Sequence, residues 1–498
     1  MNGYCVSRRS FLRMAGMTAG AALLPAWAVA AKAAQRRNVL FIAVDDLRTA
    51  LGCYGDKTIQ SPHIDRLARE GLVFERAYCQ QAICMASRAS LLSGYRPDVG
   101  EIYKNGSLYK CVPDALSLNR HFLANGYATQ SIGKVYHHKS DETVGWSRGA
   151  YHPKGDWVGR GYLTEAAKAC VKEYDERNPR AKRSGMGPAF ECADVADNAY
   201  SDGLIADKAV EALNELKDGP FFLAVGFHNP HLPFNAPKRY WDLYDPFAIP
   251  LAKNPFLPKD APKIALTSWG ELRGYHGMPR TGDMPDDLAR QLIHGYLACV
   301  SYTDAQIGRL LDELNRLGLR ENTVVVLWGD HGWKLGEHSM WCKHTNFELD
   351  THAPLIVSAP GMAARGKSTK ALTEFVDIYP TLCDLCGLER PAHLQGTSAA
   401  PLLDDPARPW KRAAFSQYPQ GSVMGYSMRT DTHRYTEWRD LAKNEVKARE
   451  LYDHERDPEE NVNVANRPEN AELVARLSEM LRLTWGRGSC SMYPSNTL

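Results

Sequence analysis

Residues 38–46 read NVLFIAVDD, an apolar run that ends abruptly in two aspartates. A run of this kind is typical of a strand buried on both faces, as the strands of parallel sheets are. Three similar runs also end in reactive side chains. Residues 127–133 are followed by Lys134 and His137, and residues 220–227 are followed by His228. Residues 322–329 are followed by Asp330 and His331. Helical periodicity separates the runs. This alternation predicts a doubly wound, mostly parallel α/β sheet with a ligand site at the carboxyl ends of its strands.

The composition is that of an ordinary globular protein with a large core. The chain has 498 residues, of which 44% are hydrophobic and 24% are charged. Sixty basic residues against 58 acidic ones leave a formal net charge of only +2. Bulk charge therefore does not indicate a nucleic-acid partner or a membrane surface, and an anionic ligand would have to meet a local cluster of cations.

Two changes in pattern indicate how the chain is organised. Residues 230–283 are rich in loops, with many Pro, Gly and Trp residues, and we interpret them as a cover over the ligand edge of the sheet. After residue 404 the pattern changes to short strand-like pieces and one amphipathic helix at about 469–483. The sequence thus predicts a main domain over 34–404 and a smaller C-terminal α+β domain over 405–498.

The first 33 residues have the features of an export signal. Arg8 and Arg9 precede Phe11 and Leu12, and a short apolar stretch then runs into small residues. This is typical of the twin-arginine route, which carries folded proteins; ordinary secretion or a membrane anchor is the alternative. We expect a periplasmic or secreted protein with no stable membrane anchor after removal of the signal. Blocking twin-arginine export should keep active protein out of the periplasm.

Acidic residues at two strand ends indicate a metal site. Asp45 and Asp46 are adjacent, and their carboxylates repel each other unless positive charge lies between them. A helix N-cap followed by an acidic first turn would explain this pair if it stood alone. Asp330 and His331 repeat the pattern at a second strand end. Hard divalent cations prefer such oxygen ligands, so the sequence predicts a bound divalent ion.

Basic side chains accompany these acidic ones. Residues in or next to the strand-exit segments include Arg88, Lys134, His137, His228 and Lys343. Taken singly, such residues are more often solvated or capping than catalytic. Their coincidence at separate strand ends favours a set of fixed donors for a tetrahedral oxyanion beside the metal, that is, a phosphate or a sulfate group.

Cys84 lies in ICMASRASLLSG, residues 83–94, with no neighbouring base in the sequence. A nucleophilic cysteine normally needs a partner that lowers the pKa of its thiol. The local sequence supplies none, so we infer that Cys84 is changed chemically before it acts.

CMASR, residues 84–88, resembles the signature of the type I, formylglycine-dependent sulfatase family, which reads cysteine, any residue, proline or alanine, serine, arginine. Ala86 stands where proline is commonest in the family. Further motifs resemble the iduronate-2-sulfatase branch, and they follow in order as VDDL, GKVYHH, GFHNPHLPF, GDHGWKLGEHSMWCK, SQYPQ, MGYSMRT and RYTEW. The resemblance covers nearly the whole chain after the export signal.

The resemblance implies an alkaline-phosphatase-like fold, with 34–404 as the sulfatase catalytic domain. It implies that a formylglycine-generating, sulfatase-maturating enzyme oxidises Cys84 to formylglycine. It also implies one bound calcium ion, whose ligands would be Asp45, Asp46, modified Cys84, Asp330 and His331. Imidazole is an unusual ligand for so hard a cation, so His331 would be a weak or indirect one.

The same resemblance assigns the remaining roles. Arg88 and Lys134 would hold the formylglycine and the sulfate, and Lys343 would contact the sulfate or the leaving group. A hydroxyl of the hydrated aldehyde would attack sulfur while His228 protonates the sugar alcohol. His137 would then take the proton of the second hydroxyl, which releases inorganic sulfate and restores the aldehyde.

The substrate implied by this branch is a sulfated saccharide, specifically the 2-O-sulfate of a uronic acid. His231, Lys238 and Arg239 are our candidates for contacting the uronate carboxylate, and the alternative, which solvated charges of this kind favour, is that all three are surface charge on the cover.

Two other functions are compatible with the sequence. A phosphomonoester or phosphonate hydrolase could use the same scaffold, although phosphatases usually bind two metals with more His and Asp ligands than this one cluster offers. A non-catalytic binder of sulfated glycans would keep Cys84 as a thiol, which distinguishes it from an enzyme.

Overall fold

The computed structural model describes residues 36–104, 107–153, 161–177 and 186–485. The predicted export signal at 1–33 lies outside these residues. Among the described helices, none combines the length and the apolar character that a membrane span requires.

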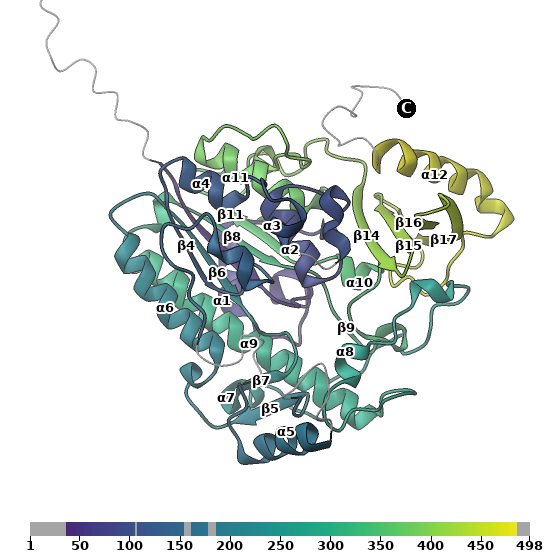
Figure 1. Cartoon of the computed structure of the whole chain (residues 1–498), viewed down its shortest axis with the longest axis horizontal. Coiled ribbons are helices and arrows are strands. Elements are labelled where there is room, and N and C mark those ends of the chain that lie inside the picture. Colours follow the sequence, from purple (N-terminus) through teal and green to yellow (C-terminus); the bar gives the residue numbers. More distant parts are fainter. Residues whose placement is uncertain (1–35, 105–106, 154–160, 178–185, 486–498) are drawn as a thin grey trace, which may run out of the picture. The chain divides into compact units, whose positions relative to one another are not determined.

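The centre of the structure is a seven-stranded sheet with the order β12-β2-β11-β8-β1-β6-β4. Its strands β4, β6, β8 and β11 are labelled in Figure 1. Its strands are β1 (Asn38–Val44), β2 (Leu72–Phe74), β4 (Ala128–Gly133), β6 (Phe221–Phe227), β8 (Thr323–Gly329), β11 (Leu355–Ser358) and β12 (Lys367–Thr369). β1 is parallel to β6 and β8, and β4 is parallel to β6. β11 is antiparallel to both of its neighbours, β8 and β2. The prediction of a doubly wound, mostly parallel sheet is confirmed, and all four strands that end in reactive residues belong to it.

Alternation along β1 creates a core on each face of the sheet. Leu40 and Ile42 belong to one apolar cluster, and Val39 and Phe41 belong to the other, because successive side chains of a strand point to opposite faces. The first cluster is completed by α1 (Pro62–Glu70), α6 (Ser201–Leu216) and α9 (Asp286–Arg316). The second is completed by α2 (Cys84–Ser93), α4 (Leu118–Ala124) and α11 (Ile378–Cys386). Both faces of the sheet are therefore buried, which explains why its central strands read as continuous apolar runs.

Shorter elements surround this sheet. The two-stranded pairs are formed by β3 (Ala77–Tyr78) with β13 (Thr373–Glu374), β5 (Phe190–Ala193) with β7 (Phe234–Pro237), and β9 (Lys334–Leu335) with β10 (Trp341–Cys342). The remaining short helices are α3 (Leu108–Cys111), α5 (Glu165–Arg177), α7 (Lys238–Trp241), α8 (Gly270–Arg273) and α10 (Glu348–Thr351). Within the predicted cover, 230–283, lie β7, α7 and α8, joined by long irregular stretches.

The C-terminal part is an antiparallel sheet with the order β14-β15-β16-β17 and one helix. Its elements are β14 (Ala414–Gln420), β15 (Val423–Arg429), β16 (His433–Asp440), β17 (Glu445–Asp453) and α12 (Ala471–Trp485). Side chains including Met428, Tyr435 and Leu477 form a separate apolar cluster there. The predicted α+β character is thus confirmed, while the exact domain boundary at 404/405 stays a prediction.

A buried ion-pair network connects this sheet to the main part. Glu374, on β13, lies 2.7 Å from Arg96 Nη1 and accepts a hydrogen bond from Lys411 Nζ at 2.9 Å. It also accepts the backbone N–H of Phe415, on β14, at 3.1 Å. Burial alone would raise the pKa of Glu374, but Arg96 and Lys411 outweigh burial and lower the pKa from 4.5 to about 2.

We expect Glu374→Gln to lower the free energy of unfolding by about 3 kcal/mol at pH 7, because it removes the buried carboxylate that faces Arg96 and Lys411 and leaves Lys411 with Asp377 alone. A carboxyl whose pKa is depressed in the folded state stabilises the fold above its unfolded pKa, and this contribution is lost as the pH falls toward the folded value. The difference from wild type should therefore shrink between pH 5 and about pH 2.

Urea unfolding at pH 7, 5 and 3 measures this effect. Glu445→Gln is the matched control, because Glu445 pairs with Lys447 at the exposed surface and should change stability by less than about 0.5 kcal/mol. A loss for Glu374→Gln that is the same at all three pH values would contradict the assignment.

Candidate active site

The strand register brings the four polar exits to one edge of the sheet. Val44 is level with Phe227 on β6 and with Gly329 on β8, and Gly133 on β4 is level with Gly226 on β6. Asp45, Lys134, His228 and Asp330 each follow one of these level positions. The convergence expected from the sequence is therefore present in the structure.

Two glycines allow β4 and β6 to approach closely at this edge. Gly133 has a φ of +75°, in the left-handed region, and a β-carbon there would overlap the carbonyl oxygen of Gly226. A β-carbon on Gly226 would overlap the carbonyl of Lys134 in turn. The backbone N–H of Lys134 donates to Gly226 O at 2.8 Å, which directs the Lys134 side chain into the site.

Cys84 is the first residue of α2 and is buried. Its Sγ lies 3.8 Å from Asp46 Oδ1 and 3.3 Å from His331 Nε2. Burial, followed by the charge of Asp45, raises the pKa of the Cys84 thiol well above its ordinary value. The thiol therefore keeps its proton and is a poor nucleophile as it stands, which agrees with the inference from the local sequence.

Arg88 lies one turn further along α2 and joins two of the strand ends. Its Nε donates to Asp330 Oδ2 at 2.8 Å, and its Nη2 donates to Asp45 Oδ1 at 3.1 Å. Lys134 Nζ also pairs with Asp45. Burial would raise the pKa of Asp45, but Lys134 and Arg88 together hold it well below its usual value. Asp45 is therefore ionised although it is buried.

Asp46 has an unusual backbone conformation, and the positive groups near its carboxylate only partly offset the cost of burying it. Its φ of 57° is left-handed, a conformation that non-glycine residues rarely adopt outside turns and functional sites. Its N–H donates to Asp330 Oδ1 at 3.0 Å, and its carbonyl accepts from the Tyr296 hydroxyl at 2.9 Å. Burial raises the pKa of Asp46, and the nearby charges of His231 and Lys343 offset only part of the shift. Further positive charge at this carboxylate would be favourable.

The donor set fits a hard divalent cation. Ligand atoms of Asp45, Asp46, Cys84 and His231 lie within 4.8 Å of one another, as do those of Cys84, Asp330 and His331. Three of these side chains are carboxylates, whose oxygens are the ligands that calcium prefers. His331 directs Nδ1 to Gly332 O at 2.9 Å and Nε2 toward Asp46 Oδ1 at 3.4 Å, at the margin of the carboxylates.

The two predicted proton-transfer histidines differ in their environments. His228 is buried, and Nδ1 lies 3.6 Å from Asp202 Oδ1, which also accepts the backbone N–H of His228. Burial lowers the pKa of His228, and Asp202 offsets this only in part. Burial and the charge of Lys134 lower the pKa of His137 to about 2. Neutral imidazole is therefore the ground state of His137 over the physiological pH range.

The three candidates for contacting a substrate carboxylate do not lie together. His231 is buried in the site, with Nε2 3.8 Å from Asp46 Oδ2. The ammonium of Lys238 is half exposed and pairs with Asp242, and the exposed guanidinium of Arg239 pairs with Asp197. The structure thus supports the interpretation of Lys238 and Arg239 as surface charge on the cover.

Some residues of the site were not singled out from the sequence. Glu271, on α8, reaches His231 Nε2 at 3.0 Å and Lys343 Nζ at 2.9 Å. Asp202 is the second residue of α6, and Tyr296 comes from α9. Glu271 lies in a four-residue helix within an irregular segment, so no periodicity or motif marks it.

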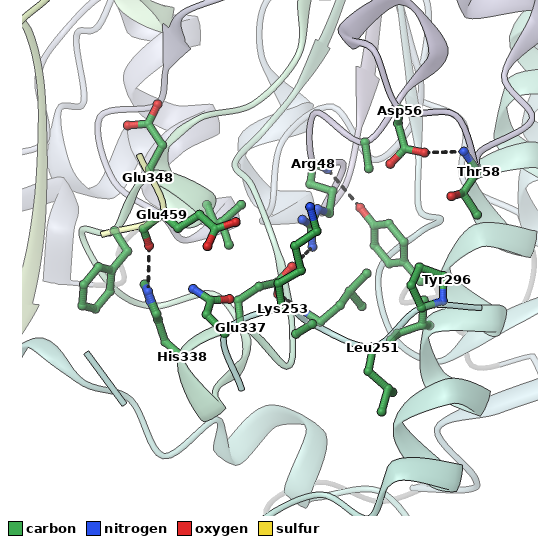
Figure 2. A pocket seen from close by; sticks show the side chains of 18 of the residues that line it. Arg48, Asp56, Thr58, Leu251, Lys253, Tyr296, Glu337, His338, Glu348 and Glu459 are labelled. Carbon is green, nitrogen blue, oxygen red and sulfur yellow. Dashed lines mark hydrogen bonds and ion pairs between the residues drawn. The ribbon is translucent and has the colours of Figure 1, made fainter. Parts of the chain in front are cut away.

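A separate pocket of about 430 Å³ lies beside the Asp46 turn (Figure 2). Arg48 and Tyr296 line it, and the Arg48 backbone N–H donates to the Tyr296 hydroxyl at 2.9 Å. Arg48 also pairs with Glu337 at 2.8 Å. None of the site residues predicted from the sequence lines this pocket, so the pocket is a neighbour of the cluster around Cys84 and not part of it.

Comparison with known proteins identifies the family. Residues 37–388 match the sulfatase family, and residues 336–485 match the C-terminal region of N-sulphoglucosamine sulphohydrolase. The chain belongs to the sulfatase family. Iduronate 2-sulfatase of Homo sapiens is 34% identical over 523 residues, which cover 88% of this chain and 93% of that protein. The family predicted from the motifs is confirmed, and this sulfatase is an enzyme that hydrolyses sulfate esters.

Two solved structures share the fold. One, of a protein in complex with its substrate D-glucosamine-2-N,6-O-disulfate, is 24% identical with a TM-score of 0.73 and covers 92% of this sulfatase and 99% of that chain. The other, the phosphonate monoester hydrolase of Agrobacterium radiobacter, is 23% identical with a TM-score of 0.71 and covers 91% and 96%. Sulfatases typically use a formylglycine and a metal, and the buried Asp/Cys/His cluster at Cys84 is consistent with both.

We expect Arg88→Met to lower the free energy of unfolding by about 3–5 kcal/mol, because it removes the cation shared by two buried carboxylates. Urea unfolding measures the loss. Arg482→Met is the control, because Arg482 pairs with Glu479 at an exposed position, and its loss should leave the free energy of unfolding nearly unchanged. An Arg88 variant as stable as this control would show that Arg88 is not needed to neutralise Asp45 and Asp330.

Proposed function

We propose that this sulfatase removes the 2-O-sulfate of a uronic acid in a sulfated saccharide, using a formylglycine made from Cys84. The observation that carries the proposal is the buried cluster itself, in which Cys84 lies beside three carboxylates and three fixed cations, Arg88, Lys134 and Lys343. The choice of a uronate 2-O-sulfate is supported by the 34% identity to human iduronate 2-sulfatase over most of both chains.

Asp45, Asp46 and Asp330 would hold one calcium ion, with residue 84 and His331 beside it. The raised pKa of Asp46, which burial causes, supports this assignment because a cation would offset the cost of burying that charge. Bound there, calcium would supply positive charge that polarises sulfate oxygens and lowers the pKa of a hydroxyl group.

The fixed cations would bind the sulfate group. Arg88, Lys134 and Lys343 are buried and need no large reorganisation to face an anion, so their charge acts at low local polarity. Once a maturating enzyme has oxidised Cys84, the hydrated formylglycine supplies the attacking hydroxyl. The position of Cys84 at the start of α2 presents this side chain to the same cations.

His228 and His137 would handle the protons. Asp202 lies at Nδ1 of His228 and so turns Nε2 toward the site, where the charge of a bound sulfate ester would raise the lowered pKa of His228. His228 could then protonate the leaving sugar oxygen. His137, whose pKa is about 2, is neutral at working pH and can accept a proton, although it is a weak base before substrate binds.

Substrate identity is tested by sulfate release from unsaturated disaccharides that carry sulfate at uronate O2 or at hexosamine O6. The sulfatase is produced with a maturating enzyme, and the Cys84 peptide is analysed by mass. We expect release from the O2-sulfated compound and at least a ~10³-fold loss in Cys84→Ala, because the nucleophile is gone.

Three other outcomes would correct the proposal in different ways. If formylglycine is present but sulfate is released only from the O6-sulfated compound, a uronate 2-O-sulfate is not the substrate. Faster hydrolysis of a phosphonate monoester, followed by release of its alcohol, would favour the phosphonate hydrolase. An unmodified Cys84 without turnover, but with tight glycan binding, would favour a binding protein.

Metal removal tests the calcium assignment. We expect a chelator to lower the melting temperature by a few degrees, because an ion that binds only the folded state stabilises it by mass action, and added calcium should restore the value. Asp46→Asn should abolish the response, whereas Asp312→Asn, at an exposed surface position, should keep it. A response that survives in Asp46→Asn would place the ion elsewhere.

A further inference from the structure

Glu271 is a buried carboxylate that joins the cover to the catalytic cluster. It lies on α8, and its side chain is only 14% exposed. Its Oε2 is 2.9 Å from Lys343 Nζ, and its Oε1 is 3.0 Å from His231 Nε2. Burial would raise the pKa of Glu271, but Lys343 and His231 outweigh burial and hold it well below its usual value. Glu271 is thus an anion in contact with the Lys343 ammonium and the His231 imidazole.

The same two groups also face Asp46. Lys343 Nζ donates to Asp46 Oδ1 at 3.0 Å and to Oδ2 at 3.1 Å, so it occupies both oxygens of a carboxylate assigned to the metal. His231 Nε2 lies 3.8 Å from Asp46 Oδ2. An ammonium group and a divalent cation compete for the same carboxylate oxygens, and a buried ammonium can leave one carboxylate only if another anion receives it.

Contacts within the cover hold Glu271 in place beside Lys343 and His231. Arg273, two residues further along α8, donates to Ser268 O at 3.1 Å, Pro279 O at 2.8 Å and Gly282 O at 2.6 Å. Its guanidinium also stacks 3.2 Å from the ring centroid of Trp269. These contacts fix α8 within the cover, so the Glu271 carboxylate has a defined position between Lys343 and His231.

We propose that Glu271 is a positioning residue that retains Lys343 and His231 when a divalent cation takes the Asp46 carboxylate, so that these two groups can yield the Asp46 oxygens to the ion. The inference rests on the proposed metal site and adds a residue that is not one of its ligands. It explains how the buried Lys343 can bind the sulfate group although Asp46, which it contacts, must bind calcium. Glu271 supplies a second anion for the Lys343 ammonium. It also gives the cover a direct role in the chemistry of the site.

Calcium affinity of the full chain, measured by calorimetric titration with calcium chloride, tests the inference directly. Glu271→Gln keeps the shape of the side chain and removes its charge, and we expect it to weaken calcium binding by about tenfold or more. Glu337→Gln is the matched control. Glu337 is 15% exposed and pairs with Arg48, two residues from Asp46, at the neighbouring pocket (Figure 2). It should change the affinity by less than about threefold.

A double-mutant cycle separates this mechanism from general electrostatics. If Glu271 acts by receiving Lys343 when calcium takes the Asp46 oxygens, Lys343→Gln should strengthen calcium binding about tenfold more in the Glu271→Gln background than in the wild-type background. If Glu271 contributes only its distant charge, the two gains should be equal, because independent effects add.

The outcomes are distinguishable. Wild-type affinity in Glu271→Gln, an equal loss in Glu337→Gln, or equal gains from Lys343→Gln in both backgrounds would each overturn the role of Glu271 and leave the metal site standing. Absence of calcium binding by the wild type would overturn the metal site and this inference together. If Glu271→Gln does not fold, Glu271→Asp, which keeps the charge but withdraws it by one methylene, should still show a smaller loss of affinity.

Discussion

The cost of burying negative charge at one edge of the sheet governs this structure. Asp45, Asp46 and Asp330 follow two neighbouring parallel strands and are almost completely removed from water. Such a group of carboxylates is tolerated only when positive charge is built around it. Arg88 and Lys134 supply that charge to Asp45, and the chain brings them from a helix and from a third strand. The parallel register is what makes this possible, because it places strand ends that are far apart in the sequence side by side.

The same burial determines the chemistry of the neutral groups. It keeps the Cys84 thiol protonated and the His137 imidazole uncharged. Cys84 is therefore not a thiolate nucleophile, and His137 is not a proton donor in its ground state. A thiol in this position is a poor nucleophile, and in the function that we propose it would serve as the precursor of formylglycine, with cations around it that suit an oxyanion. In this respect the site is preorganised for charge that arrives with the substrate, which is the arrangement that makes electrostatic stabilisation effective.

The peripheral elements are part of this arrangement. The cover contributes His231 and Glu271, and the long helix α9 contributes Tyr296, whose hydroxyl holds the left-handed Asp46 backbone. The C-terminal sheet is connected through the buried Glu374 network and adds its own apolar core. The fold alone does not choose the substrate, because a phosphonate monoester hydrolase shares it; selectivity belongs to the side chains that surround the sulfate.

The sequence by itself determined the central strands, their polar exits and the signature around Cys84. Those features are local: apolar runs, adjacent aspartates and short motifs are readable because their meaning depends on neighbours in the chain. Only the tertiary structure decided that β11 runs antiparallel, that Lys238 and Arg239 face solvent, and that Glu271 meets Lys343. The reason is physical. A strand's direction and a side chain's partner depend on contacts between segments that are distant in the sequence, and one glutamate in a four-residue helix looks like any other until the chain has folded around it.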